Sequence, residues 1–172
     1  MKQIQNYYYL LINSDDNDTT NTNCKNLNFN LGDILSSAPN TQQIQDAPYC
    51  YVKLKYFVLN EDPINYTTTN TIQIRVNKPF PNSFETKKNG IQTTNILGVV
   101  PTRVINGNHY YVEQTYSNTE YDNNYVVMGN IFNGSLNIQL TDEDGVLLAD
   151  THTNNKSYLM YLEIYFPDEN KY

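Results

Sequence analysis

Apolar and polar residues alternate with a period of two along much of the chain. In residues 72–77, Ile, Ile and Val alternate with Gln, Arg and Asn, and in residues 136–141, Leu, Ile and Leu alternate with Asn, Gln and Thr. Residues 27–31 show a similar alternation of Leu, Phe and Leu with Asn. Because the side chains of a strand point alternately to its two faces, this pattern predicts strands with one buried face.

Two longer segments are apolar on both faces. Residues 49–59 and 158–166 are rich in aromatic and aliphatic residues, which is typical of central strands covered on both sides. Further strands are predicted at residues 7–12, 96–100, 109–116 and 125–128. Together the segments predict eight or nine strands.

The connections between the predicted strands are rich in Asn, Asp, Gly and Pro, which favour turns. The connection at residues 78–90 is one of them. No sustained helical period is present, and a single helical turn is expected at residues 32–37, with Asp33 near its start. We therefore expect an all-β fold, a single jelly-roll β-sandwich of eight or nine antiparallel strands, in which residues 1–172 form one domain.

The charge of the chain argues against nucleic acid as a direct partner. Its 18 acidic and 11 basic residues give a net charge of −7, so phosphate groups would be repelled unless Lys87, Lys88 and Arg103 form a local basic patch. The apolar segment 7–12 is too short for a signal peptide or a membrane span. We expect a soluble protein that is made in the cytoplasm and is not secreted.

Residues that carry catalytic or metal chemistry are sparse. The two histidines, His109 and His152, form neither a His-x-His nor a His-x-x-x-His pair, so the ligand set of a jelly-roll metal site is missing. The chain has no Gly-x-Ser-x-Gly sequence and no glycine loop of the phosphate-binding kind. Cys24 and Cys50 have no metal or redox spacing, and buried or half-buried free thiols are favoured over a disulfide. We expect no enzyme activity, no metal and no cofactor.

The densest acidic cluster, at residues 142–145, reads Asp, Glu, Asp and Gly. An EF-hand calcium loop needs a glutamate about six residues after its glycine, and Ala149 and Asp150 follow here instead. The cluster therefore favours a β-hairpin turn with Gly145 at positive φ. The turn would join a strand that ends at Leu140 to one that starts at Val146.

Tyrosine dominates the aromatic residues, with 16 tyrosines and no tryptophan. A large rigid ring with a polar tip suits protein interfaces, although AT-rich coding would also raise the tyrosine content. The candidate interface residues crowd one stretch of predicted strand and loop: Tyr110, Tyr111, Tyr116, Tyr121 and Tyr125. Ordinary packing of the core and its rim is the alternative interpretation of these five residues.

The order of the segments carries a resemblance to a known family. The segments are an opening strand 7–13 followed by Ser14 and Asp15, the strands 27–31 and 51–59, the sequence TNILGVVP at 94–101, and the closing segments 136–145 and 158–166. In this order they resemble single jelly-roll minor capsid proteins of double-stranded DNA viruses whose major capsid protein is a double jelly roll. Virophages, polinton-like viruses and their giant-virus relatives are such viruses. The resemblance covers most of the chain, but where many members carry an arginine after the Ser-Asp pair, this chain has Asp16 and Asn17.

The resemblance implies a virion protein of the penton kind. Such a protein would form homo-oligomers, with a pentamer preferred over a trimer, and would pack against the major capsid protein and other minor capsid proteins. Its location would be the capsid, after synthesis in the host cytoplasm. The alternative function is a carbohydrate- or receptor-binding β-sandwich, in which surface tyrosines stack on sugars.

Overall fold

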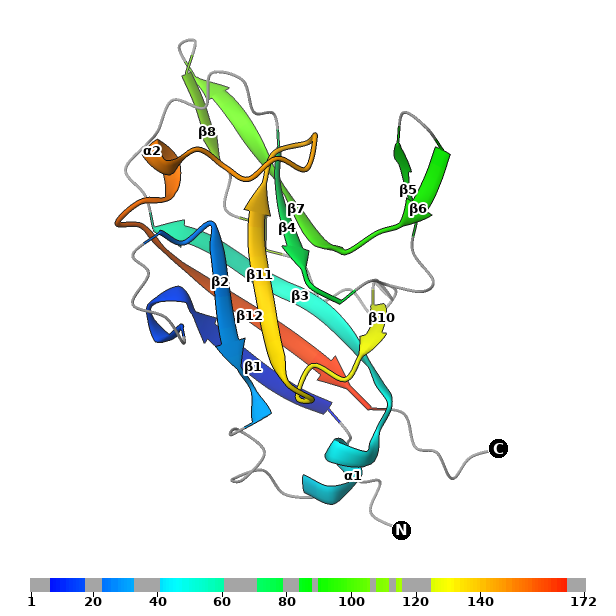
Figure 1. Cartoon of the computed structure of the whole chain (residues 1–172). Coiled ribbons are helices and arrows are strands. Elements are labelled where there is room, and N and C mark those ends of the chain that lie inside the picture. The colour runs from blue at the N-terminus through cyan, green and yellow to red at the C-terminus, as the bar shows by residue number, and fades with distance from the viewer. Residues whose placement is uncertain are drawn as a thin grey trace.

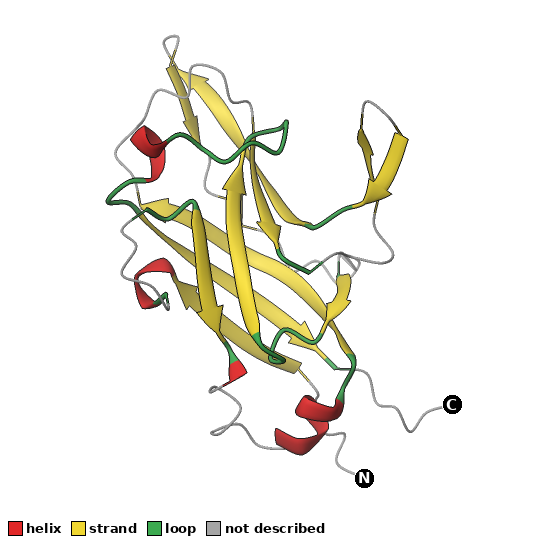
Figure 2. Ribbon diagram, in the orientation of Figure 1, coloured by secondary structure: helices red, strands yellow, loops and turns green. Residues whose placement is uncertain are grey.

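The computed structural model describes residues 7–17, 23–32, 41–60, 71–78, 84–87, 90–105, 108–111, 114–115 and 125–166. Strands make up most of this part of the chain, and the few helices are short and lie in the connections (Figure 2). The all-β fold expected from the sequence is confirmed.

One sheet, called sheet I here, has the strand order β1-β12-β3-β10. Its members are β1 (Tyr7–Asn13), β12 (Ser157–Tyr165), β3 (Tyr49–Asn60) and β10 (Val126–Gly129), and the short β9 (Gln114–Thr115) also pairs with β3. All of these pairings are antiparallel. β12 and β3 take the two central positions, as the apolar character of both segments predicts.

The second sheet, sheet II, has the order β2-β11-β4-β7-β8 and is also antiparallel. Its members are β2 (Asn26–Asn30), β11 (Ser135–Thr141), β4 (Thr71–Val76), β7 (Ile96–Ile105) and β8 (Asn108–Tyr111). β7 runs past the predicted end at Val100. Pro101 does not end it because this residue lies where β7 passes from pairing with β4 to pairing with β8.

The connectivity of the two sheets is that of a jelly roll. If the main strands are taken in chain order as β1, β2, β3, β4, β7, β10, β11 and β12, the first pairs with the last, the second with the seventh, the third with the sixth and the fourth with the fifth. A long antiparallel ribbon that is rolled up gives this pattern. Further pairing of β12 with β3 and of β11 with β4 completes the two sheets, which lie face to face in Figure 1.

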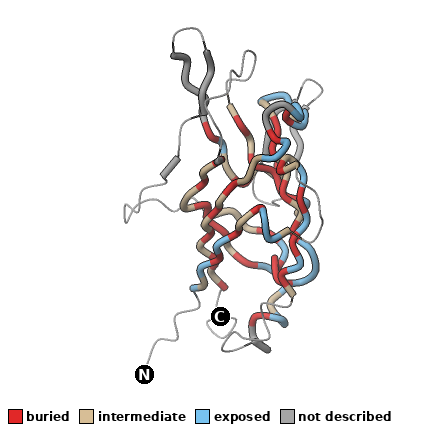
Figure 3. The backbone as a smooth tube through the Cα atoms, turned by 90° about the vertical axis from the view of Figure 1, so that its left-hand side faces the viewer, coloured by how far each residue is buried: buried red, intermediate tan, exposed pale blue. Residues whose placement is uncertain are grey.

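The core lies between the sheets and is built by the period-two alternation. Along β12 every second residue is buried, from Tyr158 to Ile164, and β11 buries Leu136, Ile138 and Leu140 in the same way. Figure 3 shows this succession of buried and less buried residues along the chain. Side chains from both sheets belong to a single cluster of buried residues.

Four short elements were not predicted. They are β5 (Phe84–Lys87) and β6 (Gly90–Thr93), which form a separate hairpin, and the helices α1 (Thr41–Asp46) and α2 (Asp150–Thr153). The prediction that residues 78–90 form only a turn-rich connection is therefore wrong. Each of these four segments holds at most one apolar residue, so its sequence shows no period. The predicted helical turn at 32–37 lies almost wholly outside the described residues.

Tertiary contacts hold α1 in place. Its one described apolar side chain, Ile44, is 2% exposed. The carboxamide of Asn130, in the turn between β10 and β11, donates to the carbonyl oxygens of Ile44 at 2.5 Å and Ala47 at 2.9 Å. Carbonyls at the end of a helix lack partners within the helix, so Asn130 satisfies two such groups and joins α1 to sheet I. A short 3-10 helix, η1 (Ser14–Asp16), follows β1.

Candidate functional site

The outer face of sheet I carries the clearest functional signal. In β1 the side chains that point away from the core are Tyr7, Tyr9 and Leu11, which are 45%, 59% and 59% exposed. Cross-strand pairing places β12 and β3 residues beside them, with Tyr165 opposite both Tyr7 and Tyr51. We call this surface the tyrosine face, and its members are Tyr7, Tyr9, Leu11, Tyr49, Tyr51, Tyr161 and Tyr165.

The rings of the tyrosine face contact one another across three strands. Tyr7 and Tyr165 have ring centroids 4.9 Å apart, and Tyr165 and Tyr51 lie 5.8 Å apart. Tyr9 stacks on Tyr161 at 5.7 Å with an interplanar angle of 12°. Contacts of this kind favour fixed ring orientations. The face is therefore a preformed aromatic surface whose outer part, on β1, is open to solvent.

A cluster of charged groups lies within the same face. Glu163 on β12 is opposite Lys53 on β3, and the Nζ of Lys55 lies 3.7 Å from the Oε2 of Glu163. The hydroxyl of Tyr125 donates to Oε1 of Glu163. The Lys53 ammonium lies 5.8 Å from the centroid of the Tyr125 ring, within cation–π range. Lys53 is only 5% exposed, and the side chains of Lys55 and Glu163 are 10% and 12% exposed, so this cluster is largely shielded from solvent.

Burial and Glu163 both raise the pKa of the nearby phenols. Burial raises the pKa of Tyr125 well above its ordinary value, and the hydrogen bond to Glu163 raises it further. The pKa of Tyr9 is also raised, first of all by the negative charge of Glu163. At neutral pH both hydroxyls are therefore neutral hydrogen-bond donors. The face offers rings and donors for packing and no activated nucleophile.

The outer face of sheet II has a different chemistry. The carboxamide of Asn137 donates to the side-chain oxygens of Asn26 at 2.7 Å and Asn28 at 3.0 Å. Asn77 accepts from the backbone N–H of Asn137 at 3.1 Å. These amides satisfy one another on a solvated surface. The contrast with the rings of sheet I shows that the two outer faces of the sandwich differ in chemistry.

The five tyrosines proposed from the sequence have different positions. Tyr110 and Tyr111 belong to β8, opposite Arg103 and Thr102, but their side chains lie outside what the structure describes. Tyr116 and Tyr121 also lie outside the described residues. Tyr125 is half-buried and joins the tyrosine face through Glu163. The exposed tyrosines of β1 were not proposed, although the spacing of Tyr7 and Tyr9 was a readable signal for rings on one face.

The acidic turn at 142–145 is a tight turn, as predicted. Gly145 has φ of +79°, its N–H donates to the Asp142 carbonyl at 3.1 Å, and the Asp142 carboxylate accepts from the N–H groups of Asp144 and Val146. The predicted strand that starts at Val146 is wrong. Only a single bridge, from Thr141 to Leu147, follows the turn, because the chain enters α2 three residues later.

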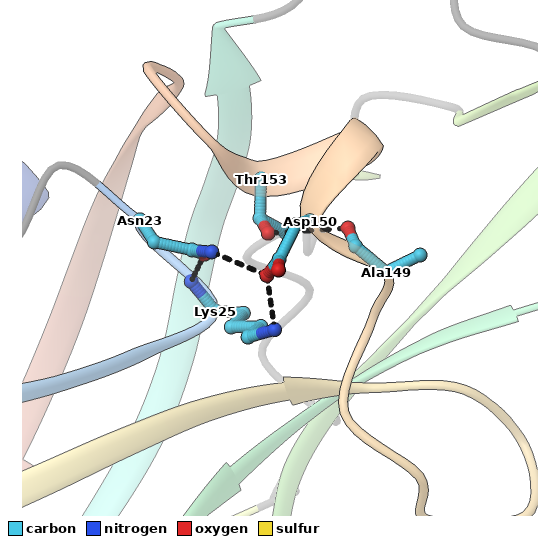
Figure 4. Close-up of polar contacts among 5 residues, drawn as sticks. All are labelled: Asn23, Lys25, Ala149, Asp150 and Thr153. Carbon is cyan, nitrogen blue, oxygen red and sulfur yellow. Dashed lines mark hydrogen bonds and ion pairs between the residues drawn. The ribbon is translucent and has the colours of Figure 1, made fainter.

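A second polar cluster joins the start of β2 to α2 (Figure 4). The Asp150 carboxylate accepts from the Asn23 carboxamide at 2.7 Å and from the Lys25 ammonium. The backbone N–H of Cys24 donates to the Thr153 carbonyl at 3.1 Å. These contacts lower the pKa of Asp150, mainly through the hydrogen bond from Lys25. The cluster anchors the connection between β11 and β12, which is a structural role.

Metal ligands and thiols are the remaining candidate groups among the described residues. No group of three or more His, Cys, Asp or Glu side chains in this part of the chain could hold a metal ion. Cys24 and Cys50 are buried free thiols, as favoured from the sequence, and burial raises the pKa of Cys50 to about 11, so its thiolate is scarce at neutral pH.

Two further findings bear on identity. Comparisons with protein-family models and with curated proteins give no match for this chain. Among the described residues, no helix is long and apolar enough to cross a membrane.

Proposed function

We propose that the chain is a non-enzymatic structural protein of a virus particle, a minor capsid subunit of the penton kind. The observation that supports this proposal best is the tyrosine face, an aromatic surface on a jelly-roll sandwich that carries hydrogen-bonded amides on β2 and β11 of its other sheet. Single exposed apolar residues are ordinary, but a contiguous group of them indicates an interaction surface. The class of partner in this proposal is the one that the resemblance in segment order implies.

The proposed subunit forms homo-oligomers, with a pentamer preferred over a trimer, and packs against the major capsid protein and other minor capsid proteins. Tyrosines supply large contact areas with little loss of side-chain freedom, and their hydroxyls remain satisfied at a wet rim. The net charge of −7 suits a shell component that does not contact the genome. The protein would reach the virion after synthesis in the host cytoplasm.

Native mass spectrometry of the purified chain tests this proposal. We expect a ring of five subunits. The double variant Tyr49→Ser, Tyr51→Ser removes two aromatic side chains of the tyrosine face on β3, away from β1. It should dissociate the five-membered assembly into monomers. Val99→Ser is the matched control, because Val99 is 42% exposed on sheet II and Tyr49 is 40% exposed on sheet I. A wild-type chain that stays monomeric, alone and with major capsid protein, would contradict the proposal.

Carbohydrate binding is the second candidate function. The observation that favours it is the stacked pair Tyr9 and Tyr161, because Tyr9 keeps 59% of its surface exposed and could stack on a sugar ring. A glycan array separates the two functions. Saturable binding by a monomer, lost in Tyr9→Ser, would favour the carbohydrate-binding function, and the capsid proposal expects no such response.

A further inference from the structure

β1 is an edge strand whose outer edge has no partner among the described strands. It stands at the end of sheet I and pairs with β12 alone, over all seven of its residues from Tyr7 to Asn13. The backbone N–H and C=O groups along its other edge are a template for a further strand. Natural proteins guard such an edge with charged residues, proline, bulges or a cover.

The sequence of β1 contains none of these protective features. It reads Tyr-Tyr-Tyr-Leu-Leu-Ile-Asn, without charge, proline or glycine, and Tyr9 and Leu11 are each 59% exposed. β2, the corresponding edge of sheet II, instead exposes Asn26, Asn28 and Asn30 and follows directly after Lys25. The edge strand β2 is thus polar, whereas the edge strand β1 is apolar and pairs with β12 without a bulge. These are the properties of a strand that pairs with a further strand at an interface.

The strand is complementary to a second copy of itself. In an antiparallel junction centred on Leu10, Tyr9 faces Leu11 of the other copy, Tyr7 faces Asn13, and Tyr8 faces Ile12. In this register, residues that point to solvent lie opposite residues that point to solvent, and core-facing residues lie opposite core-facing residues. A shift by one residue would destroy this match. Like charges opposite each other destabilise strand pairs. The junction avoids this cost because β1 has no charged side chain.

Charge and size also favour a second copy as the occupant. Two chains of net charge −7 repel each other over most of their surfaces, so contact is favoured where charge is absent, as it is along β1. Seven residues give a junction roughly 24 Å long. Each tyrosine that becomes fully covered adds on the order of 150 Å². Tyr7 and Tyr9 of the two copies together add at most about 600 Å², which is below the roughly 1,200 Å² at which stable interfaces begin, so the pairing should be weak and reversible.

We propose that β1 pairs antiparallel with β1 of a second copy across a two-fold axis, joining the two copies of sheet I into one continuous sheet. This pairing goes beyond the proposed function and does not depend on it. A chain that forms no ring would give dimers, and five-membered rings joined through β1 would give ten subunits.

A charge placed on the edge tests the pairing. Leu11→Lys introduces a lysine at a position that meets Tyr9 of the other copy, and the two-fold axis brings two such charges into the junction. We expect the dissociation constant from sedimentation velocity to rise at least tenfold, about 1.4 kcal/mol. Val146→Lys is the matched control, since Val146 is 61% exposed and lies outside β1. An equal effect of both variants, or no effect of Leu11→Lys, would overturn the proposal.

Disulfide trapping tests the register. Mixing Tyr9→Cys chains with differently tagged Leu11→Cys chains should give a disulfide-linked heterodimer under mild oxidation, because the two positions face each other. Each variant alone should cross-link at least tenfold less. The native Cys24 and Cys50 are 2% and 0% exposed and should not compete. Cross-linking in the mixture no greater than in the single variants would contradict the proposed register.

The outcomes separate this inference from the proposed function. Dimers that are lost in Leu11→Lys, without rings, support the β1 junction and contradict the pentamer. Five-membered rings unaffected by Leu11→Lys support the pentamer and overturn the junction. Complexes of ten subunits that split into rings of five in Leu11→Lys, and into dimers in the Tyr49→Ser, Tyr51→Ser variant, support both, because each change then removes one of two separate contacts.

Discussion

Tyr158 illustrates at the scale of one residue how apolar packing and polar groups compete in the core. It is 1% exposed and packs against Phe57 with ring centroids 5.6 Å apart. Its hydroxyl is buried without a hydrogen-bond partner among the described residues. Burial accordingly raises the pKa of Tyr158 far above its ordinary value. The ring stabilises the fold, whereas the hydroxyl costs desolvation and gains no bond.

Removing this hydroxyl should therefore be tolerated. For Tyr158→Phe we expect a free energy of unfolding within about 1 kcal/mol of wild type, or higher, because no hydrogen bond is lost. Phe57→Ala, which removes a neighbouring ring, should cost about 3–5 kcal/mol. Urea unfolding followed by circular dichroism measures both values. A large loss in Tyr158→Phe would show that the hydroxyl is bonded.

The Asp150 cluster makes stability depend on pH. The hydrogen bond from Lys25 is the main cause of the lowered Asp150 pKa, followed by that from Asn23. A carboxyl group with a lowered pKa stabilises the fold at pH values above its ordinary value of 3.8 and loses this contribution as the pH falls through the folded-state pKa. The urea midpoint of unfolding should be higher for wild type than for Asp150→Asn at neutral pH. This difference should shrink below pH 3.8. Asp144→Asn, another exposed position, is the control, and an advantage that persists at low pH would refute this linkage.

At the scale of the elements, β3 shows why the positions of the strands were easier to predict than which of their side chains point to solvent. The residues that point inward are Cys50, Val52 and Leu54 in its first half, but Phe57 and Leu59 in its second half. The register with β12 shifts at this point and passes over Lys55, which forms a bulge. From the sequence alone this change of phase looks like apolar residues on both faces. The strand was therefore predicted correctly, and its exposed tyrosines were not recognised.

The turn after β11 has a glycine with a conformational role. Gly145 has φ of +79°, and an added Cβ would lie 3.4 Å from the guanidinium of Arg75. Gly145→Ala should therefore lower the free energy of unfolding by about 1–2 kcal/mol. Gly129 in β10 is the matched control because a Cβ there meets nothing within 4 Å, and Gly129→Ala should be neutral or slightly stabilising. Equal effects of the two substitutions would contradict a role for the backbone at Gly145.

At the scale of the whole molecule, period-two alternation was enough to predict the sandwich. The hydrogen-bonded order of strands depends on contacts between distant residues, such as Tyr7 with Tyr165, which no local pattern contains. For the same reason the sequence could not show that the rings of β1, β3 and β12 form one face, although the spacing of Tyr7 and Tyr9 was readable. The sequence drew attention instead to tyrosines that are neighbours along the chain. The short β5–β6 hairpin and α1 were missed because their segments hold at most one apolar residue each and therefore show no period.

Hydrogen–deuterium exchange, compared between the dissociated and the assembled protein, tests most directly whether sheet I is the assembly surface. We predict that the amides of β1 exchange rapidly along its free edge in the monomer and become protected on assembly, while those of β2 do not change. Protection confined to β2 and the outer face of sheet II, with β1 unchanged, would contradict the account.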